Sequence, residues 1–148
     1  MEKISTNLAN DLYQLMKQIP KMKLASASQN SFTRSESELL VFLAINVNED
    51  NSALSVSELS SLLQISAAGT THLLNPLEEA DCIERLRDPN DRRVVLVGLT
   101  PKGYKIAESM ILEFQQKISG LMTYLGEDDS QTLVRLMRLM IEYFTPEQ

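Results

Sequence analysis

The sequence predicts a mainly α-helical fold of the α+β class, in which a helix-turn-helix and one small β-hairpin stand between longer helices. Two helix starts in close succession, Ser55 followed by Glu58 and then Ser66, predict the helix-turn-helix. Two β-prone runs at 83–87 and 94–97, separated by a turn, predict the hairpin. Apolar residues at helical spacing near both ends of the chain predict the longer helices.

Length and composition limit the class of protein. A chain of 148 residues with 43% hydrophobic and 23% charged residues is typical of one globular domain, or of a small domain with extensions. The first residues carry no apolar signal-peptide core, and no run is long enough to span a membrane. The single cysteine excludes an intrachain disulfide and suits a reducing compartment. We therefore expect a cytoplasmic protein without membrane association.

The N-terminal part predicts two helices. Apolar residues recur at helical spacing over 3–24, and Pro20 either kinks this helix or ends it near residue 19. Residues 25–31 form a polar linker. The next helix begins at Thr33 or Ser35, because each is followed three residues later by a glutamate that completes a capping box.

The middle of the chain predicts the helix-turn-helix and the hairpin. After a loop at 48–53, a helix of about two turns runs over 56–63, and only Gln64 and Ile65 separate it from a helix that reaches about residue 80. Pro76 lies inside that second helix, where it removes one hydrogen bond and favours a bend. The turn of the hairpin, Asp-Pro-Asn-Asp at 88–91, has typical turn chemistry.

The C-terminal part predicts two further helices. Thr100 and Pro101 suit the first positions of a helix over about 101–123, and Gly126 precedes a last helix over about 129–144. The apolar faces of the terminal helices have little to cover them within one chain, so we expect a second copy to cover them. The chain would then comprise a dimerisation helix and linker at 1–32, a helix-turn-helix lobe with its hairpin at 33–100, and C-terminal dimerisation helices at 101–148.

Charge is unevenly distributed along the chain. The formal net charge is −6, which taken alone argues against a polyanionic partner. Residues 35–81 contain eight acidic residues and no lysine or arginine, whereas 82–103 contain five basic and three acidic residues. Because salt screens charges beyond about 8 Å, a locally basic hairpin can act despite the acidic total.

The hairpin region resembles the MarR-type transcriptional regulators, which are winged-helix dimers. Their wing signature, Asp-x-Arg followed by Leu-Thr, is matched here in full. The approach to the wing and the Glu-Leu of the first helix of the helix-turn-helix match as well. The matching residues are Asp91, Arg93, Leu99, Thr100, the segment 77–85, Glu58 and Leu59.

The resemblance implies a winged helix-turn-helix and a homodimer held by the terminal helices. It implies a transcriptional regulator, in the first place a repressor, that binds a pseudo-palindromic operator in double-stranded DNA. Many relatives release DNA when a small, often phenolic, effector binds. The alternative from another class is a dimeric small-molecule sensor or protein-interaction module of the same fold that has lost tight DNA binding, which the acidic segment 35–81 motivates.

The candidate DNA-binding residues lie on the wing and on the second helix of the helix-turn-helix. A wing arginine, Arg92 or Arg93, would enter the minor groove while Asp91 orients Arg93; the alternative is a solvated turn. The helix would present hydroxyls and one imidazole to the major groove. Because it contains no lysine or arginine, it cannot make bidentate contacts to guanine. The alternative is that this is a generic helix surface without a role in binding. The remaining candidates, for major-groove contact and then for phosphate contact, are Ser66, Thr70, Thr71, His72, Arg85, Arg34 and Lys102.

An effector site is expected from family geometry between the first, second and fifth helices, near Tyr13, Met16, Phe32 and Met110. No metal is expected, because His72 is the only histidine and no cysteine cluster accompanies it.

No cofactor motif and no paired catalytic constellation is present, so an enzyme is not expected. Cys82 is either a redox sensor, as in some relatives, or a buried inert thiol, and the second interpretation is favoured.

Overall fold

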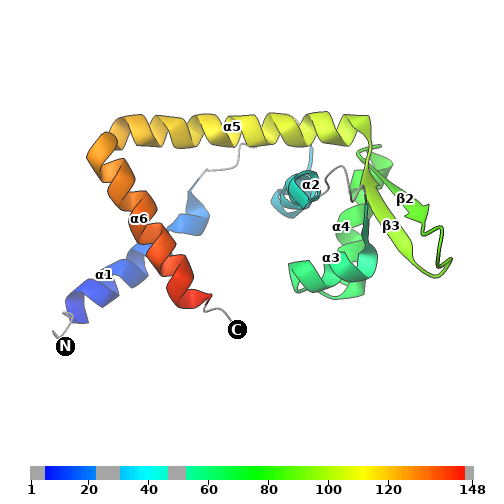
Figure 1. Cartoon of the computed structure of the whole chain (residues 1–148), viewed down its shortest axis with the longest axis horizontal. Helices are drawn as coiled ribbons and strands as arrows, with labels where there is room; N and C mark the ends of the chain where they lie inside the picture. Colours follow the sequence, from blue (N-terminus) through cyan, green and yellow to red (C-terminus); the bar gives the residue numbers. More distant parts are fainter. Residues whose placement is uncertain (1–5, 23–30, 47–52, 146–148) are drawn as a thin grey trace.

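The computed structural model describes residues 6–22, 31–46 and 53–145. One long helix, α5 (Pro101–Leu125), connects its two parts. A lobe lies at one end of α5 and is formed by α2 (Arg34–Asn46), α3 (Val56–Leu63), α4 (Ala67–Glu79), β2 (Ile83–Arg87) and β3 (Val95–Leu99). Helices α6 (Glu127–Phe144) and α1 (Thr6–Met16) lie toward the other end (Figure 1). The predicted α+β class is confirmed, and the sheet has three strands instead of the two that the hairpin alone predicts.

The N-terminal segment is shorter than the predicted helix over 3–24. Helix α1 covers Thr6–Met16, and a 3-10 turn, η1 (Ile19–Lys21), follows it. Pro20 lies in this turn, so the change of path occurs where the sequence predicts it, because proline cannot donate the next helical hydrogen bond. The remaining parts of the predicted helix, nearly all of the linker 25–31 and most of the loop 48–53 lie outside the described residues.

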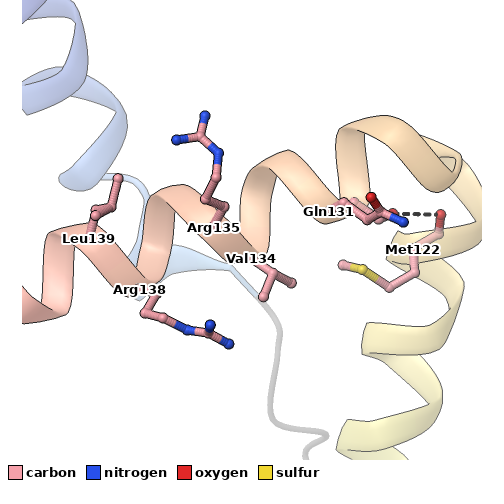
Figure 2. A pocket seen from close by; sticks show the side chains of 7 residues that line it. Met122, Gln131, Val134, Arg135, Arg138 and Leu139 are labelled. Carbon is pink, nitrogen blue, oxygen red and sulfur yellow. Dashed lines mark hydrogen bonds between the residues drawn. The ribbon is translucent and has the colours of Figure 1, made fainter.

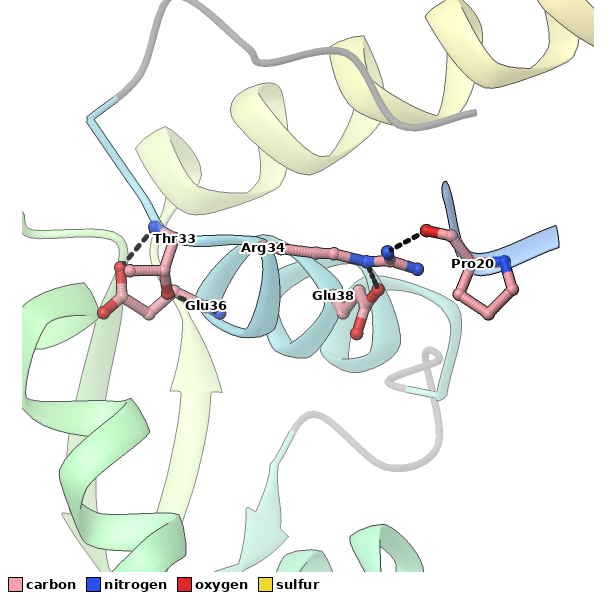
Figure 3. Close-up of polar contacts among 5 residues, drawn as sticks. All are labelled: Pro20, Thr33, Arg34, Glu36 and Glu38. Atoms are coloured by element: carbon pink, nitrogen blue, oxygen red, sulfur yellow. Dashed lines mark hydrogen bonds and ion pairs between the residues drawn. The ribbon is translucent and has the colours of Figure 1, made fainter. Parts of the chain in front are cut away.

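Helix α2 (Arg34–Asn46) begins at the first of the two predicted starts. The Thr33 N–H donates to Glu36 Oε2 at 2.8 Å, and the Glu36 N–H donates to Thr33 Oγ1 at 3.3 Å (Figure 3). This reciprocal capping box selects Thr33 over Ser35. Three leucines of α2, Leu39, Leu40 and Leu43, are buried in the core of the lobe.

The helix-turn-helix consists of α3 (Val56–Leu63) and α4 (Ala67–Glu79). Behind it the antiparallel sheet has the strand order β1-β3-β2, formed by β1 (Leu54–Ser55), β3 (Val95–Leu99) and β2 (Ile83–Arg87). Val97 pairs with Leu54 on one side and with Arg85 on the other. The second hairpin strand is predicted at 94–97, and pairing carries it to Leu99 instead.

The core of the lobe is made of side chains from every element around it, and α5 reaches it near its N-terminus through Ala107. The fully or nearly buried members are Leu39, Leu40, Leu43, Leu54, Leu59, Leu74, Leu77, Cys82, Ile83, Val97 and Ala107. Burial of Cys82 confirms the favoured interpretation of a buried thiol. The lobe therefore holds α4 and the hairpin on one shared apolar core.

The last helix differs from those of the lobe in that its apolar side chains are not buried. Helix α6 (Glu127–Phe144) follows Gly126, whose φ of +80° suits glycine and lets the helix begin two residues before the predicted start. None of its 18 residues is buried. Many of the large apolar side chains on α6 and α1 are at least 40% exposed, among them Leu8, Leu12, Leu15, Leu136, Met137 and Ile141.

Candidate nucleic-acid interface

The turn between α3 and α4 is determined by local hydrogen bonds. Ser55 and Glu58 form the predicted capping box of α3, and the Gly69 N–H donates to Ser66 Oγ at 3.0 Å at the start of α4. Gln64 adopts the left-handed conformation with φ of 53°, which reverses the chain within two residues. The short link therefore sets the two helices at a fixed angle.

Thr70 joins the two helices from the inside. Its hydroxyl oxygen lies 2.9 Å from the Ser60 hydroxyl oxygen and 3.2 Å from the Ser66 carbonyl oxygen, and its side chain is fully buried. The sequence-based expectation places Thr70 in the major groove. A side chain without exposed surface does not reach DNA, so that prediction is corrected: Thr70 shares the inward stripe of Leu74 and Leu77.

The outward face of α4 presents Ser66, Thr71 and His72, which are all exposed as predicted. The Ser66 hydroxyl already caps the helix, which leaves Thr71 and His72 as its polar groups in the first turns. Asn75 is exposed one turn further along. Sequence reasoning did not select Asn75, although it lies four residues after Thr71 and therefore on the same face.

The tip of the wing is ordered by two aspartates. Asp88 Oδ1 accepts from the Asn90 and Asp91 N–H groups at 2.7 and 3.0 Å, and Asp91 Oδ1 accepts from the Arg93 N–H at 3.0 Å. Asp91 therefore orients Arg93 through its backbone. Arg92 and Arg93 are exposed, and no ion pair in the described part of the chain involves either guanidinium. Two cations are thus available on a structured turn.

A groove of about 440 Å³ separates the wing from the helix-turn-helix. The start of α3, the outer face of α4 and both strands of the wing line it through Ser55, Val56, Ser57, Thr71, Asn75, Arg85, Arg93, Val94 and Val95. Ser57 and Asn75 are members that sequence reasoning missed, because only the folded arrangement brings them beside Arg93. A groove with hydroxyl, amide and guanidinium donors suits a phosphate backbone.

The three residues that the sequence predicts as phosphate contacts each donate hydrogen bonds to other groups of the protein. Arg85 donates to Glu78 and Asn75, Arg34 to Glu38 at 2.7 Å and to the Pro20 carbonyl at 3.0 Å, and Lys102 to the Ala80 carbonyl at 2.6 Å. Figure 3 shows Arg34 reaching from α2 toward Pro20. In this structure Arg34 therefore joins α2 to η1, and Lys102 caps the C-terminal end of α4.

The four predicted effector-site residues lie on three segments. Tyr13 and Met16 are 58% and 40% exposed on α1, Phe32 packs against the core of the lobe, and Met110 is half-buried on α5. A cavity of about 400 Å³ lies instead at the elbow of α5 and α6, where the Ser130 hydroxyl donates to the Met122 carbonyl at 3.1 Å (Figure 2). That elbow cavity is lined by none of the four.

Within the described residues there is neither a metal-binding cluster nor a membrane-spanning helix. No group of three or more His, Cys, Asp or Glu side chains in the described ranges is arranged to hold a metal ion. Among the described helices, none is long and apolar enough to cross a membrane.

Comparison with known proteins agrees with this geometry. A model of the MarR family matches residues 31–94, which contain the helix-turn-helix, β2 and the tip of the wing. Over these 64 of its 148 residues the chain is similar to the MarR family, which supports a MarR-type regulator. The resemblance carried by the wing signature is therefore confirmed.

Proteins with similar sequences include HTH-type regulators from bacteria. The chain is 34% identical over 82 residues to the uncharacterized HTH-type transcriptional regulator YwhA of Bacillus subtilis, covering 55% of this chain and 59% of that one. It is 27% identical over 94 residues to the transcriptional repressor MprA of Escherichia coli, covering 64% and 53%. The match thus spans somewhat more than half the length of these relatives.

The likeness in fold extends over nearly the whole chain. A crystal structure of MepR, a transcription regulator of the Staphylococcus aureus multidrug efflux pump MepA, superposes with a TM-score of 0.73. The superposition covers 90% of this chain and 96% of MepR at 21% identity. At that identity the likeness establishes the winged-helix fold, including the terminal helices.

Proposed function

We propose that this chain is a MarR-type transcriptional regulator that binds a pseudo-palindromic DNA operator as a homodimer, in the first place as a repressor. One observation carries the proposal: Thr71 and Asn75 on the exposed outer face of α4 and the exposed Arg93 of the wing flank a single groove. This arrangement suits a helix in the major groove and a wing in the adjacent minor groove. The repressor role is supported by the name of the relative MprA.

The division of contacts follows from exposure and charge. Arg92 and Arg93 would enter the narrow minor groove, where the potential is most negative. Ser66, Thr71 and His72 would meet the major groove, and Asn75 would join them. Since α4 contains no lysine or arginine, the wing would supply most of the positive charge.

The homodimer is proposed from the exposed apolar faces of α1 and α6. Burial of such faces in water is favourable by about 25 cal/mol per Å² of apolar surface, and a second copy offers the complementary surface. Sedimentation equilibrium should give twice the chain mass. Leu136→Asp combined with Ile141→Asp should produce monomers, because charges would then lie in the interface.

An effector that releases DNA is part of the proposal. The site would lie near Tyr13, Met16, Phe32 and Met110, where α1 faces the lobe in a dimer. A panel of small phenolic acids should weaken DNA binding by the wild type, and Tyr13→Ala with Met16→Ala should abolish that response. An intact response in the double variant would exclude this site. A regulator of transcription would act in the cytoplasm of a bacterium, where the chromosome lies.

Fluorescence anisotropy tests the DNA-binding proposal. The wild-type chain is titrated with the duplex from upstream of its own gene and with a random duplex at the same salt concentration. We expect clear preference for the upstream duplex and loss of that preference in Arg92→Ala/Arg93→Ala. Wild-type binding no tighter than to the random duplex would contradict the regulator and favour the sensor alternative that the acidic segment 35–81 motivates.

A further inference from the structure

Three side chains form a polar bracket between the recognition helix and the wing: Asn75 and Glu78 on α4, and Arg85 on β2. The Arg85 guanidinium donates through Nη1 to Glu78 Oε2 and through Nη2 to Asn75 Oδ1, the latter at 2.9 Å. Asn75 and Glu78 are three residues apart on a helix and therefore share one face. One planar cation thus joins two elements that separately carry the proposed DNA contacts.

The bracket is partly shielded from water. The Arg85 side chain is 26% exposed and the Glu78 side chain 39%, so water screens the pair only in part. Arg85 and Asn75 also line the groove, together with Thr71 and Arg93. The bracket therefore lies between the two surfaces that would have to fit the DNA at once.

We propose that Arg85 is a positioning residue for DNA binding, which sets the wing relative to α4 and does not itself neutralise a phosphate. This inference rests on the proposed DNA-binding function. Because the Asn75 carbonyl oxygen accepts from Arg85, the amide presents its Nδ2 donors for an acceptor on DNA. Arg85 therefore acts through the placement of Arg93 and through the orientation of Asn75.

Replacement of Glu78 separates positioning from simple charge. Glu78→Gln makes the chain more positive by one unit, so an electrostatic contribution alone would tighten DNA binding. If Arg85 positions the wing, the substitution replaces a charge-assisted hydrogen bond with a weaker one and loosens the wing. The two mechanisms thus predict opposite signs for the same substitution.

The test uses the full chain and the upstream duplex in anisotropy titrations. We expect Glu78→Gln to weaken binding about tenfold. The matched control is Glu79→Gln, which removes the same charge from the exposed neighbour on α4, and we expect it to leave affinity within about twofold or tighten it. Equal tightening in both variants would overturn the proposal.

Salt dependence supplies a readout that distinguishes positioning from phosphate contact. In Arg85→Gln and Arg85→Lys we expect weaker binding with an unchanged slope of log affinity against log salt. If Arg85 instead contacted a phosphate, Arg85→Gln would make the negative slope shallower by about 0.9 for each Arg85 lost. Arg85→Lys would then largely keep the wild-type slope, because lysine also neutralises a phosphate. That result would overturn the proposal.

Hydrogen exchange without DNA separates failure of the bracket from failure of the DNA-binding function. In Glu78→Gln we expect faster amide exchange at 85–95, on the wing, and unchanged exchange in α5. Unchanged wing exchange would overturn the bracket even if the protein binds DNA. Faster wing exchange in a protein that shows no preference for any duplex would overturn the functional role and leave the bracket as a purely structural one.

Discussion

The hydroxyl groups of Ser60 and Thr70 lie 2.9 Å apart and join the two helices of the helix-turn-helix inside the lobe. Ser60 donates to the Val56 carbonyl at 2.8 Å, so the Thr70 hydroxyl donates to Ser60, and the two hydroxyls form a short, partly buried chain of hydrogen bonds. The angle at which α4 meets DNA would depend on this contact between two small polar side chains.

Thr70→Val should therefore act on stability. Valine keeps the shape of threonine and removes the hydroxyl, so we expect the free energy of unfolding to fall by about 1–2 kcal/mol in urea titrations. Ser60 keeps its bond to Val56, which limits the loss. Unchanged stability together with lost DNA affinity would show that the Thr70 hydroxyl faces the DNA after all.

Gly103 leaves no room for a side chain. A Cβ at this position would lie 1.9 Å from the Cys82 carbonyl oxygen, where the start of α5 contacts the turn before β2. We expect Gly103→Ala to lower the free energy of unfolding by about 3 kcal/mol or more, because backbone must move.

The matched control for that substitution lies on the same helix. A Cβ at Gly120 would meet nothing within 4 Å, so Gly120→Ala should stabilise the protein by up to about 1 kcal/mol through helix propensity. Thermal unfolding of both variants measures the difference. Similar effects of the two substitutions would contradict the close approach of α5 to Cys82.

Much of the fold is predictable because its signals are local. The capping boxes at Thr33 and Ser55 and the proline start of α5 each involve residues within a few positions of one another. The two-residue strand β1 had no such signal, because its pairing with Leu96 and Val97 depends on contacts more than 40 residues away in the sequence.

In the candidate site, too, some features have a local sequence signal and others depend on contacts between distant residues. The exposed wing arginines follow from the turn chemistry around them, whereas the engagement of Arg85 by Asn75 and Glu78 depends on how the wing folds against α4. The burial of Thr70 does have a local signal. Its spacing of four and seven residues from Leu74 and Leu77 places it on the inward stripe of α4.

The capping box of α3 should give stability a dependence on acidic pH. Hydrogen bonds from the Ser55 N–H and then from its hydroxyl lower the pKa of Glu58. Because the folded state favours the carboxylate, this contribution is complete above the ordinary pKa of 4.5 and is lost as pH falls through the lowered folded pKa.

Glu58→Ala should therefore be less stable than the wild type at pH 7, and the difference should shrink at about pH 3. Urea unfolding at the two pH values measures it. Glu58→Gln is the control, since its uncharged side chain accepts the Ser55 N–H at both pH values and its stability relative to Glu58→Ala should change little. A wild-type advantage that is equal at both pH values would contradict the assignment.

Cys82 should be unreactive in the native protein. Its side chain is fully buried, and burial is the main cause that raises the pKa of its thiol. We expect Ellman's reagent to modify it only on the timescale of unfolding, and peroxide to leave DNA affinity unchanged. Modification of one thiol per chain within seconds under native conditions would restore the redox-sensor interpretation.

The salt dependence of DNA binding tests the central claim most directly. In the wing, Arg87, Arg92 and Arg93 are exposed, so a dimer offers six such arginines. At about 0.9 for each phosphate neutralised, the slope of log affinity against log salt should be no steeper than about −5. In Arg92→Ala/Arg93→Ala the slope should become shallower by about 3–4. A wild-type slope near −10, typical of strongly basic repressors, or a slope that the double substitution leaves unchanged, would contradict a wing-dependent DNA-binding dimer.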